Sequence, residues 1–308
     1  MSIEIIHPKD EAEWHSLRRE VVTSTEVAAL FDASPYTTLF ELWHRKRDRS
    51  VISIESNERM RWGNRLQDAI AAGIAEDQGW TIRKMTEFIK NTDSRLGASF
   101  DFEVTAPEEA AGILEIKNVD SFIFKSDWLV DGDHVEATPQ IEFQCQTQLA
   151  VSEKKRVWLA PFIGGNKVEL IRRERDEKAI EAIKARVKDF WASIDANVEP
   201  TPDFSRDSKF IASLYGFANP GTEYAGGNIS LLRDLVVEYK RLGEIEKEAK
   251  SGKDALKAKI LMEIGTSEKV KGDTFSISAG MIGPAEVSYT REGYRDFRVF
   301  TKKEKVKV

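Results

Sequence analysis

Cysteine is nearly absent from this chain of 308 residues, which contains one, Cys145. A single thiol cannot form a disulfide framework or a four-cysteine iron-sulfur cluster, and it favours the reducing cytoplasm. No apolar run approaches the roughly 18 residues needed to span a membrane. The first residues also lack the basic and then apolar pattern of a signal peptide. We therefore expect a soluble, cytoplasmic protein.

Positive charge is not in excess, and histidine is scarce. The 46 Lys and Arg residues face 52 Asp and Glu residues, a net charge of −6, which argues against a nucleic-acid partner because phosphate contacts need cations. Charge is local, however. Basic residues cluster at 44–47 and 59–65, and with Arg18 and Arg19 they would line a channel; a solvated helix face is the alternative for 44–47. The four histidines show no metal-ligand spacing: His7, His15, His44 and His134.

Two short apolar runs carry charged residues in an informative arrangement. Asp101 lies near the end of the first run, and fourteen residues later the second contains Glu115, Ile116 and Lys117. Side chains alternate along a strand, so Glu115 and Lys117 point the same way while Ile116 points into the core. Asp101 on a neighbouring strand can then meet Glu115 around a hard cation, Mg²⁺ or Mn²⁺. The arrangement is typical of a metal-dependent phosphodiesterase site.

The spacing of an acid, any residue and a lysine is weak evidence by itself. It recurs in polar, mostly helical surroundings, where surface pairs are expected: Glu153/Lys155, Asp176/Lys178, Asp207/Lys209, Glu238/Lys240 and Glu248/Lys250. Glu115 differs because aliphatic residues surround it, so a buried strand would desolvate it unless it is paired or metal-bound. An ion pair with Lys117 on a half-exposed strand is the alternative, and Asp101 favours the metal site.

Further motifs occur in a fixed order along the first half of the chain. They are Trp14-His15-Ser16-Leu17-Arg18, Thr23-Ser24-Thr25-Glu26-Val27-Ala28, Arg61-Trp62-Gly63-Asn64-Arg65, then Asp101, Glu115-Ile116-Lys117, and Gln144-Cys145-Gln146-Thr147-Gln148-Leu149. This order resembles the phage-type, lambda-exonuclease-like (YqaJ) recombinases, members of the PD-(D/E)XK nuclease superfamily. The resemblance covers about residues 14–160. It implies an exonuclease that digests one strand of linear double-stranded DNA from its 5′ end, in a bacterial host or phage-infected cell.

The resemblance also implies partners and a set of site residues. The expected partners are double-stranded DNA ends and a single-strand annealing protein, and the expected assembly is a trimeric ring. Asp101 and Glu115 would be metal ligands, with the backbone carbonyl of Ile116 as a third, and two Mg²⁺ or Mn²⁺ ions would occupy each site. Lys117 would position or activate the water, and Gln144 would lie near the site on the following helix.

Four residues are expected to bind DNA. Arg18 and Thr25 match the family positions that hold a 5′-terminal or scissile phosphate, and Arg61 and Arg65 belong to the basic cluster before the site. We expect a helix over 23–31 that begins with the cap residues Thr23 to Thr25, so its free N–H groups would attract the same phosphate.

One position departs from the family pattern. Gln67 stands where the family usually carries an acid, four residues after the Trp-Gly pair, and Asp68 follows it. A neutral amide cannot act as an anionic ligand, so the site would use fewer carboxylates or recruit Asp68 or Glu76. Two other functions stay open: an endonuclease that cuts circular duplex, and a catalytically silent DNA-end-binding module.

The pattern of elements predicts an α/β fold with a restriction-endonuclease-like core, a mixed sheet flanked by helices. Expected strands are 80–88, 96–104, 113–119 and 155–162, and expected helices are 58–78, 140–152 and 176–197. We expect Trp62 in the core. The nuclease domain would span residues 1–200, followed by a turn-rich connection at 201–227.

The remaining segment, 228–308, predicts a helical hairpin that turns at Ser251-Gly252, followed by short closing strands at 275–277 and 297–299. It contains no catalytic constellation, and we interpret it as a packing or oligomerisation element. The argument for DNA clamping or partner docking is the set of terminal lysines: Lys302, Lys303, Lys305 and Lys307.

Overall fold

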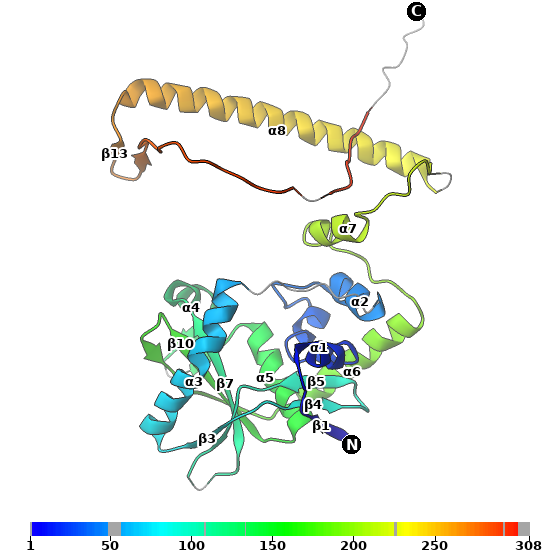
Figure 1. Cartoon of the computed structure of the whole chain (residues 1–308), viewed down its shortest axis with the longest axis vertical. Coiled ribbons are helices and arrows are strands. Elements are labelled where there is room, and N and C mark those ends of the chain that lie inside the picture. The colour runs from blue at the N-terminus through cyan, green and yellow to red at the C-terminus, as the bar shows by residue number, and fades with distance from the viewer. Residues whose placement is uncertain are drawn as a thin grey trace, which may run out of the picture. The chain divides into compact units, whose positions relative to one another are not determined.

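The computed structural model describes residues 2–48, 57–107, 109–132, 134–224, 227–291 and 293–300 (Figure 1). The chain divides into two units, Met1–Ile211 and Ala212–Val308, and each is described by itself. Gly226 of the predicted connection and the four terminal lysines lie outside the described residues.

The first unit is built on a mixed sheet with the strand order β11-β10-β7-β6-β3, with β12 also paired to β10. The parallel neighbours β7 and β10 are joined by a crossover that contains α5, and the other pairs are antiparallel. The predicted α/β core is therefore confirmed. The elements are β3 (Thr81–Lys84), β6 (Phe102–Thr105), β7 (Gly112–Val119), α5 (Pro139–Ser152), β10 (Arg156–Ile163), β11 (Lys167–Val168) and β12 (Ile171–Glu174).

A second sheet has the strand order β1-β4-β5-β2. Along the sequence, its strands are interleaved with strands of the first sheet. Its strands are β1 (Ile3–Ile6), β2 (Val22–Thr23), β4 (Phe88–Asn91) and β5 (Leu96–Ser99). The predictions of single strands over 80–88 and 96–104 were wrong, because each segment is divided between the two sheets. The second division falls at Phe100 and Asp101, so Asp101 lies where the chain leaves one sheet and enters the other.

Helices α3 (Glu58–Gln78) and α5 cover opposite faces of β7 (Figure 1). Leu114 and Ile116 pack with the α3 residues Ile70 and Ile74, whereas Ile113 belongs to the cluster that includes Cys145 and Leu149 of α5. The alternation along β7 therefore turns Glu115 and Lys117 toward α5, as their spacing predicted.

Trp62 is half-exposed, at 50%, and its predicted place in the core was wrong. It belongs to the same row of α3 as Leu66, Ile70 and Ile74, which are spaced four residues apart. Ile70 and Ile74 are buried and Leu66 is partly buried, so coverage of the row falls toward the start of the helix. The apolar periodicity identified this row of side chains, but it could not show at which residue the rest of the protein stops burying the row.

The remaining elements of the first unit surround these two sheets. They are α1 (Glu11–Arg19), the 3₁₀ helix η1 (Val27–Phe31), α2 (Leu39–Asp48), α4 (Ser121–Asp127), β8 (Leu129–Asp131), β9 (His134–Glu136), α6 (Glu177–Asp195) and α7 (Ser208–Leu214), which crosses the unit boundary. Within the described ranges, no helix is long and apolar enough to cross a membrane.

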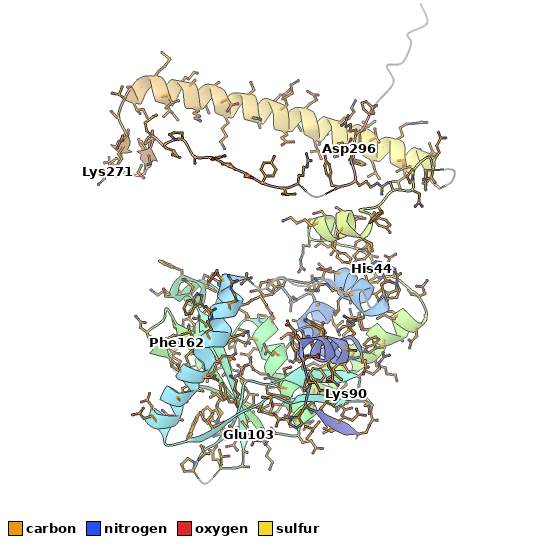
Figure 2. All side chains as sticks on the ribbon, viewed as in Figure 1. His44, Lys90, Glu103, Phe162, Lys271 and Asp296 are labelled. Atoms are coloured by element: carbon orange, nitrogen blue, oxygen red, sulfur yellow. The ribbon has the colours of Figure 1, made fainter. Side chains whose placement is uncertain are left out.

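The basic cluster at 44–47 belongs to α2, and two of its members are buried: His44 (Figure 2), which bonds Glu199, and Lys46. Arg45 pairs with Glu41. The sequence suggested either a continuous channel lining or a solvated helix face. Because two members of the cluster are buried, neither interpretation describes it.

The second unit contains one continuous helix, α8 (Ile229–Ile264), and the predicted hairpin was wrong. A single exposed glycine costs a helix only about 1 kcal/mol relative to alanine, and good helix formers flank Ser251-Gly252 on both sides. The helix ends at Gly265, and β13 (Lys269–Lys271) and β14 (Ser276–Ser278) follow as a small ribbon. The expected strand at 297–299 is irregular chain instead.

Candidate active site

Asp101 is held by two hydrogen bonds, one from β7 and one from α3. Its Oδ2 accepts the backbone N–H of Ile116 at 2.8 Å, and its Oδ1 accepts Nε2 of Gln67 at 3.0 Å. Gln67 reaches the carboxylate from α3, whereas Ile116 is the residue next to Glu115. The turn between the two sheets thus brings Asp101 beside Glu115.

Glu115 is buried, at 3% exposure, within a network of side chains from β7 and α5. Its Oε1 accepts Nζ of Lys117 at 2.6 Å and Nε2 of Gln144 at 2.7 Å, and its Oε2 accepts Nε2 of Gln148 at 2.7 Å. Lys117 also donates to Oε1 of Gln144 at 2.9 Å. Every described polar contact of the Glu115 carboxylate is therefore a donor, as a buried anion requires.

The electrostatics of this network are unusual for carboxylates. Burial raises the pKa of Asp101 to about 7, the neighbouring Glu115 carboxylate adds to the rise, and the Lys117 ammonium opposes it. Burial would lower the pKa of Lys117, but the Glu115 and Asp101 carboxylates raise it more. Two carboxylates therefore share one ammonium, and an additional cation would relieve their repulsion.

The oxygen atoms of the site fit a hard divalent cation. In an extended strand the N–H and C=O of one residue face the same neighbour, so the carbonyl of Ile116 faces the edge at which Asp101 binds its N–H. Asp101, Glu115 and this carbonyl are ligands that suit Mg²⁺ or Mn²⁺, and such ions keep several waters. Across the part of the chain that the structure describes, no group of three or more His, Cys, Asp and Glu side chains gathers as a richer site.

The structure shows what surrounds Gln67 and the two acids, Asp68 and Glu76, that were considered as an extra ligand. Gln67 contacts Asp101, and it does so as a donor. Asp68 instead accepts Nζ of Lys84, on β3, at 2.6 Å, and Glu76 lies on the exposed face of α3. The amide therefore orients a carboxylate, and neither neighbouring acid contacts Asp101.

A second polar site lies around the end of α1. Arg18 donates from Nη2 to Oγ1 of Thr25 at 3.2 Å, and its guanidinium lies 4.4 Å from the ring centroid of Trp14. The predicted helix over 23–31 was wrong: Thr25 lies in a turn, and η1 begins at Val27 and has five residues. The structure therefore brings Arg18 and Thr25 together, but it removes the argument from a helix N-terminus.

We name the group formed by Trp14, Arg18 and Thr25 the Arg18 pocket. Ser99, at the end of β5, connects this group with the carboxylates. Its Oγ accepts Nε1 of Trp14 at 2.9 Å, and its carbonyl accepts Nε2 of Gln148 at 3.2 Å. Gln148 donates to Glu115 as well, so one buried amide spans both sites. Sequence reasoning gave no role to Ser99 or Gln148. The available signal was the four-residue spacing of Gln144 and Gln148, which places them on one helix face.

Residues 13–155 match the family described as the YqaJ-like viral recombinase domain. This part of the chain, somewhat less than half of it, is similar to that family. The uncharacterized protein YqaJ of Bacillus subtilis (strain 168) is 20% identical over 249 residues, which cover 80% of this chain and 76% of that protein. The resemblance drawn from the ordered motifs is therefore confirmed.

Solved structures similar to the chain include two exonucleases. The alkaline exonuclease LHK-Exo of Laribacter hongkongensis is 22% identical, with a TM-score of 0.48. The match covers 65% of this chain and 100% of the LHK-Exo chain. A phage-related exonuclease from Haemophilus somnus 129PT is 13% identical, covers 60% of this chain and 98% of its own, and has a TM-score of 0.41.

Two further residues predicted to bind DNA lie on the first half of α3. Arg61 pairs with Glu58, and the guanidinium of Arg65 lies 5.1 Å from the ring centroid of Trp62. They share this helix with Gln67, but no described contact joins either arginine to the carboxylates. Their role in DNA binding stays a prediction, and the exposed Trp62 adds an aromatic surface beside them.

Proposed function

We propose that the chain is a metal-dependent 5′-to-3′ exonuclease that degrades one strand of linear double-stranded DNA. The observation that carries this proposal is the buried Glu115 beside Asp101, with Lys117 and Gln144 bound to the same carboxylate. Similarity to a viral recombinase family supports the use of the resulting 3′ single-stranded tails in phage-type recombination.

Asp101, Glu115 and the carbonyl of Ile116 would hold Mg²⁺ or Mn²⁺, with two ions per site when DNA phosphate completes the ligands. When bound, the metal supplies a water of lowered pKa and neutralises charge on the phosphate. Asp101 must lose its proton to act as a ligand, and its pKa of about 7 makes that loss a step near neutral pH.

Lys117 acts as a cation and not as the base. Its pKa is raised by the two carboxylates against the effect of burial, so the ammonium stays protonated while it faces the scissile phosphate. Gln144 accepts from Lys117 and donates to Glu115, which fixes the direction of the ammonium. Lys117 then stabilises the negative charge that develops on the phosphate oxygens.

The direction of degradation would come from the pocket of Arg18 and Thr25. A guanidinium fork binds a phosphate through paired hydrogen bonds, and a terminal phosphate exposes more oxygen atoms than an internal one. The bonds through Ser99 and Gln148 give a path from this pocket to Glu115. We propose that a 5′-phosphorylated end enters here.

The proposal extends to the setting of the enzyme. From the similarity to the viral recombinase family we propose a single-strand annealing protein as its partner, a homotrimeric ring as its assembly, and the cytoplasm of a bacterial host as its location.

Linear duplex labelled separately at each end, with circular duplex beside it, tests the proposal. We expect release of the 5′ label as nucleotides, retention of the 3′-ended strand, no cutting of circles, and no reaction when EDTA removes the metal. Cutting of circles would indicate an endonuclease. Binding of ends without release at any Mg²⁺ or Mn²⁺ concentration would indicate a silent end-binding module.

A further inference from the structure

Lys46 of α2 is a buried cation next to the Arg18 pocket. It is 6% exposed, and within the described ranges it is the only lysine of the buried class. Its Nζ donates to Oε2 of Glu26 at 2.7 Å and to the backbone carbonyl of Arg18 at 2.7 Å. One ammonium therefore joins the end of α1 to the turn that contains Thr25.

Glu26 is a partly buried anion beside the same pocket. It follows Thr25 in the chain, and its Oε2 accepts the backbone N–H of Thr23 at 2.9 Å. Burial would raise the pKa of Glu26, but the charges of Lys46 and Arg18 lower it more, so the carboxylate is ionised at neutral pH. The charge of Arg18 thus acts on Glu26, although the hydrogen bonds of Glu26 go elsewhere.

An ionised Glu26 is a competitor for any phosphate that binds Arg18. A carboxylate and a phosphate oxygen make the same kind of charge-assisted bond to a guanidinium. Lys46 binds the Glu26 carboxylate. The Arg18 guanidinium instead contacts the Thr25 hydroxyl and the Trp14 ring. Stability alone gives no reason for this arrangement, because a buried ion pair gains little over well-packed apolar residues.

We propose that Lys46 is a positioning residue for 5′-phosphate recognition: by binding the Glu26 carboxylate and the Arg18 carbonyl, it leaves the Arg18 guanidinium free for a terminal phosphate. The inference rests on the function proposed above for the Arg18 pocket. Lys46 itself does not touch the DNA; it removes the competitor and holds the backbone of Arg18.

The test measures the ratio of affinities for two fluorescent duplexes that differ only in a 5′-phosphate or a 5′-hydroxyl end. Binding is followed by anisotropy in EDTA, so that hydrolysis does not interfere. Lys46→Met should lower the 5′-phosphate preference by about tenfold or more, the value of one charge-assisted hydrogen bond. Glu26→Gln should keep the preference, because it removes the competitor.

The double variant Lys46→Met/Glu26→Gln decides between positioning and a general structural role. If Lys46 acts by neutralising Glu26, the double variant regains the preference that Lys46→Met loses. A double variant that stays indiscriminate overturns the proposal, as does a Lys46→Met protein that keeps the full preference. If Lys46→Met does not fold, Glu26→Gln still tests the idea, since loss of preference in that variant contradicts competition.

A matched control pair lies away from the pocket. Lys154 binds Glu103, on β6 (Figure 2), at 2.5 Å, and Lys154→Met should leave the preference unchanged; a comparable loss there would overturn the proposal. Failure of the proposed function has a different outcome: wild-type protein would itself bind both duplexes equally. In that case the Arg18 pocket is not a phosphate site, and the role of Lys46 falls with it.

Discussion

At the scale of single residues, the site is a set of amides that hold carboxylates in place. Gln67 donates to Asp101, and Gln144 and Gln148 donate to Glu115. Neutral donors fix the carboxylates without cancelling their charge, which leaves that charge available to a metal ion. Lys117 is the one cation bonded to Glu115 among the described contacts, and it binds only one of the two oxygens.

Removal of a carboxylate should abolish hydrolysis. Asp101→Ala or Glu115→Ala would take away a proposed metal ligand, and Lys117→Ala should lower the rate by about 10² or more because it removes a charge that would act on the transition state. Release of labelled nucleotides from linear duplex measures the effect. Asp68→Asn, on the same helix as Gln67 but paired with Lys84, is the control and should keep wild-type activity. Near-normal turnover of the Asp101 or Glu115 variant would refute the assignment.

The pKa of Asp101 predicts how stability depends on pH without metal. Its folded pKa, about 7, exceeds the ordinary value of 3.8, so the folded state takes up a proton that the unfolded chain releases. Asp101 thus favours folding most below about pH 4, and this contribution is lost as the pH rises through about 7, with a slope of at most about 1.4 kcal/mol per pH unit.

Urea unfolding in EDTA between pH 5 and pH 8 measures this dependence, and Asp101→Asn should remove it. The same linkage predicts that Mn²⁺ raises the melting temperature more at pH 8 than at pH 6, because protons compete for Asp101. An unfolding free energy whose pH dependence is equal in wild type and Asp101→Asn would contradict the assignment of the shift.

Gln67→Glu tests what the missing acid does. A carboxylate in place of the amide would add an anionic ligand and would lose the bond that Gln67 donates to Asp101. We expect the Mg²⁺ concentration for half-maximal activity to fall, and the metal-free protein to unfold more easily because two carboxylates then face each other. An unchanged titration, or loss of activity in a folded protein, would place Gln67 outside the metal shell.

At the scale of elements, local patterns predicted what they encode. The predicted helix over 58–78 matches α3 residue for residue, and the ends of β7, β10 and α5 lie within one residue of the predicted ends. Apolar periodicity and turn residues indicate the bounds of such elements in the sequence. The break at Phe100 and Asp101 could not be seen, since it depends on which sheet each half joins. Glu115 and Lys117 were found from their alternation along one strand, and Asp101 from its place near the end of the preceding apolar run. Ser99 gave no such signal, because its contacts depend on its position at the end of β5.

The error in α8 leads to a test within one helix. Gly243 and Gly252 both lie in α8, and a Cβ added at either meets no neighbour within 4 Å. Replacement of each by alanine should strengthen the local helix by about 1 kcal/mol, roughly a fivefold slowing of amide exchange around the site. If residues 251–252 formed a hairpin turn, Gly243→Ala would slow exchange and Gly252→Ala would not. Hydrogen exchange followed by mass spectrometry distinguishes the two outcomes.

At the scale of the first unit, two sheets meet at the candidate site. The end of β5, in the sheet that also contains β2, carries Ser99, which binds Trp14 of the Arg18 pocket. The other sheet carries Glu115 and Lys117 on β7. Gln148 of α5 is bonded to both sheets, so one buried amide links the proposed site of end recognition to the proposed site of cleavage.

This division predicts that two variants fail in different ways. Arg18→Ala should erase the preference between 5′-phosphate and 5′-hydroxyl ends while hydrolysis of hydroxyl ends continues, because the guanidinium acts only on the terminal phosphate. Gln148→Met should keep the binding preference but lower kcat for both ends, because it frees one oxygen of Glu115 and the carbonyl of Ser99. Steady-state kinetics on the two substrates separate these effects. An Arg18 variant that retains the preference would place the phosphate elsewhere, and a Gln148 variant with wild-type kcat would show that the amide does not hold the catalytic carboxylate.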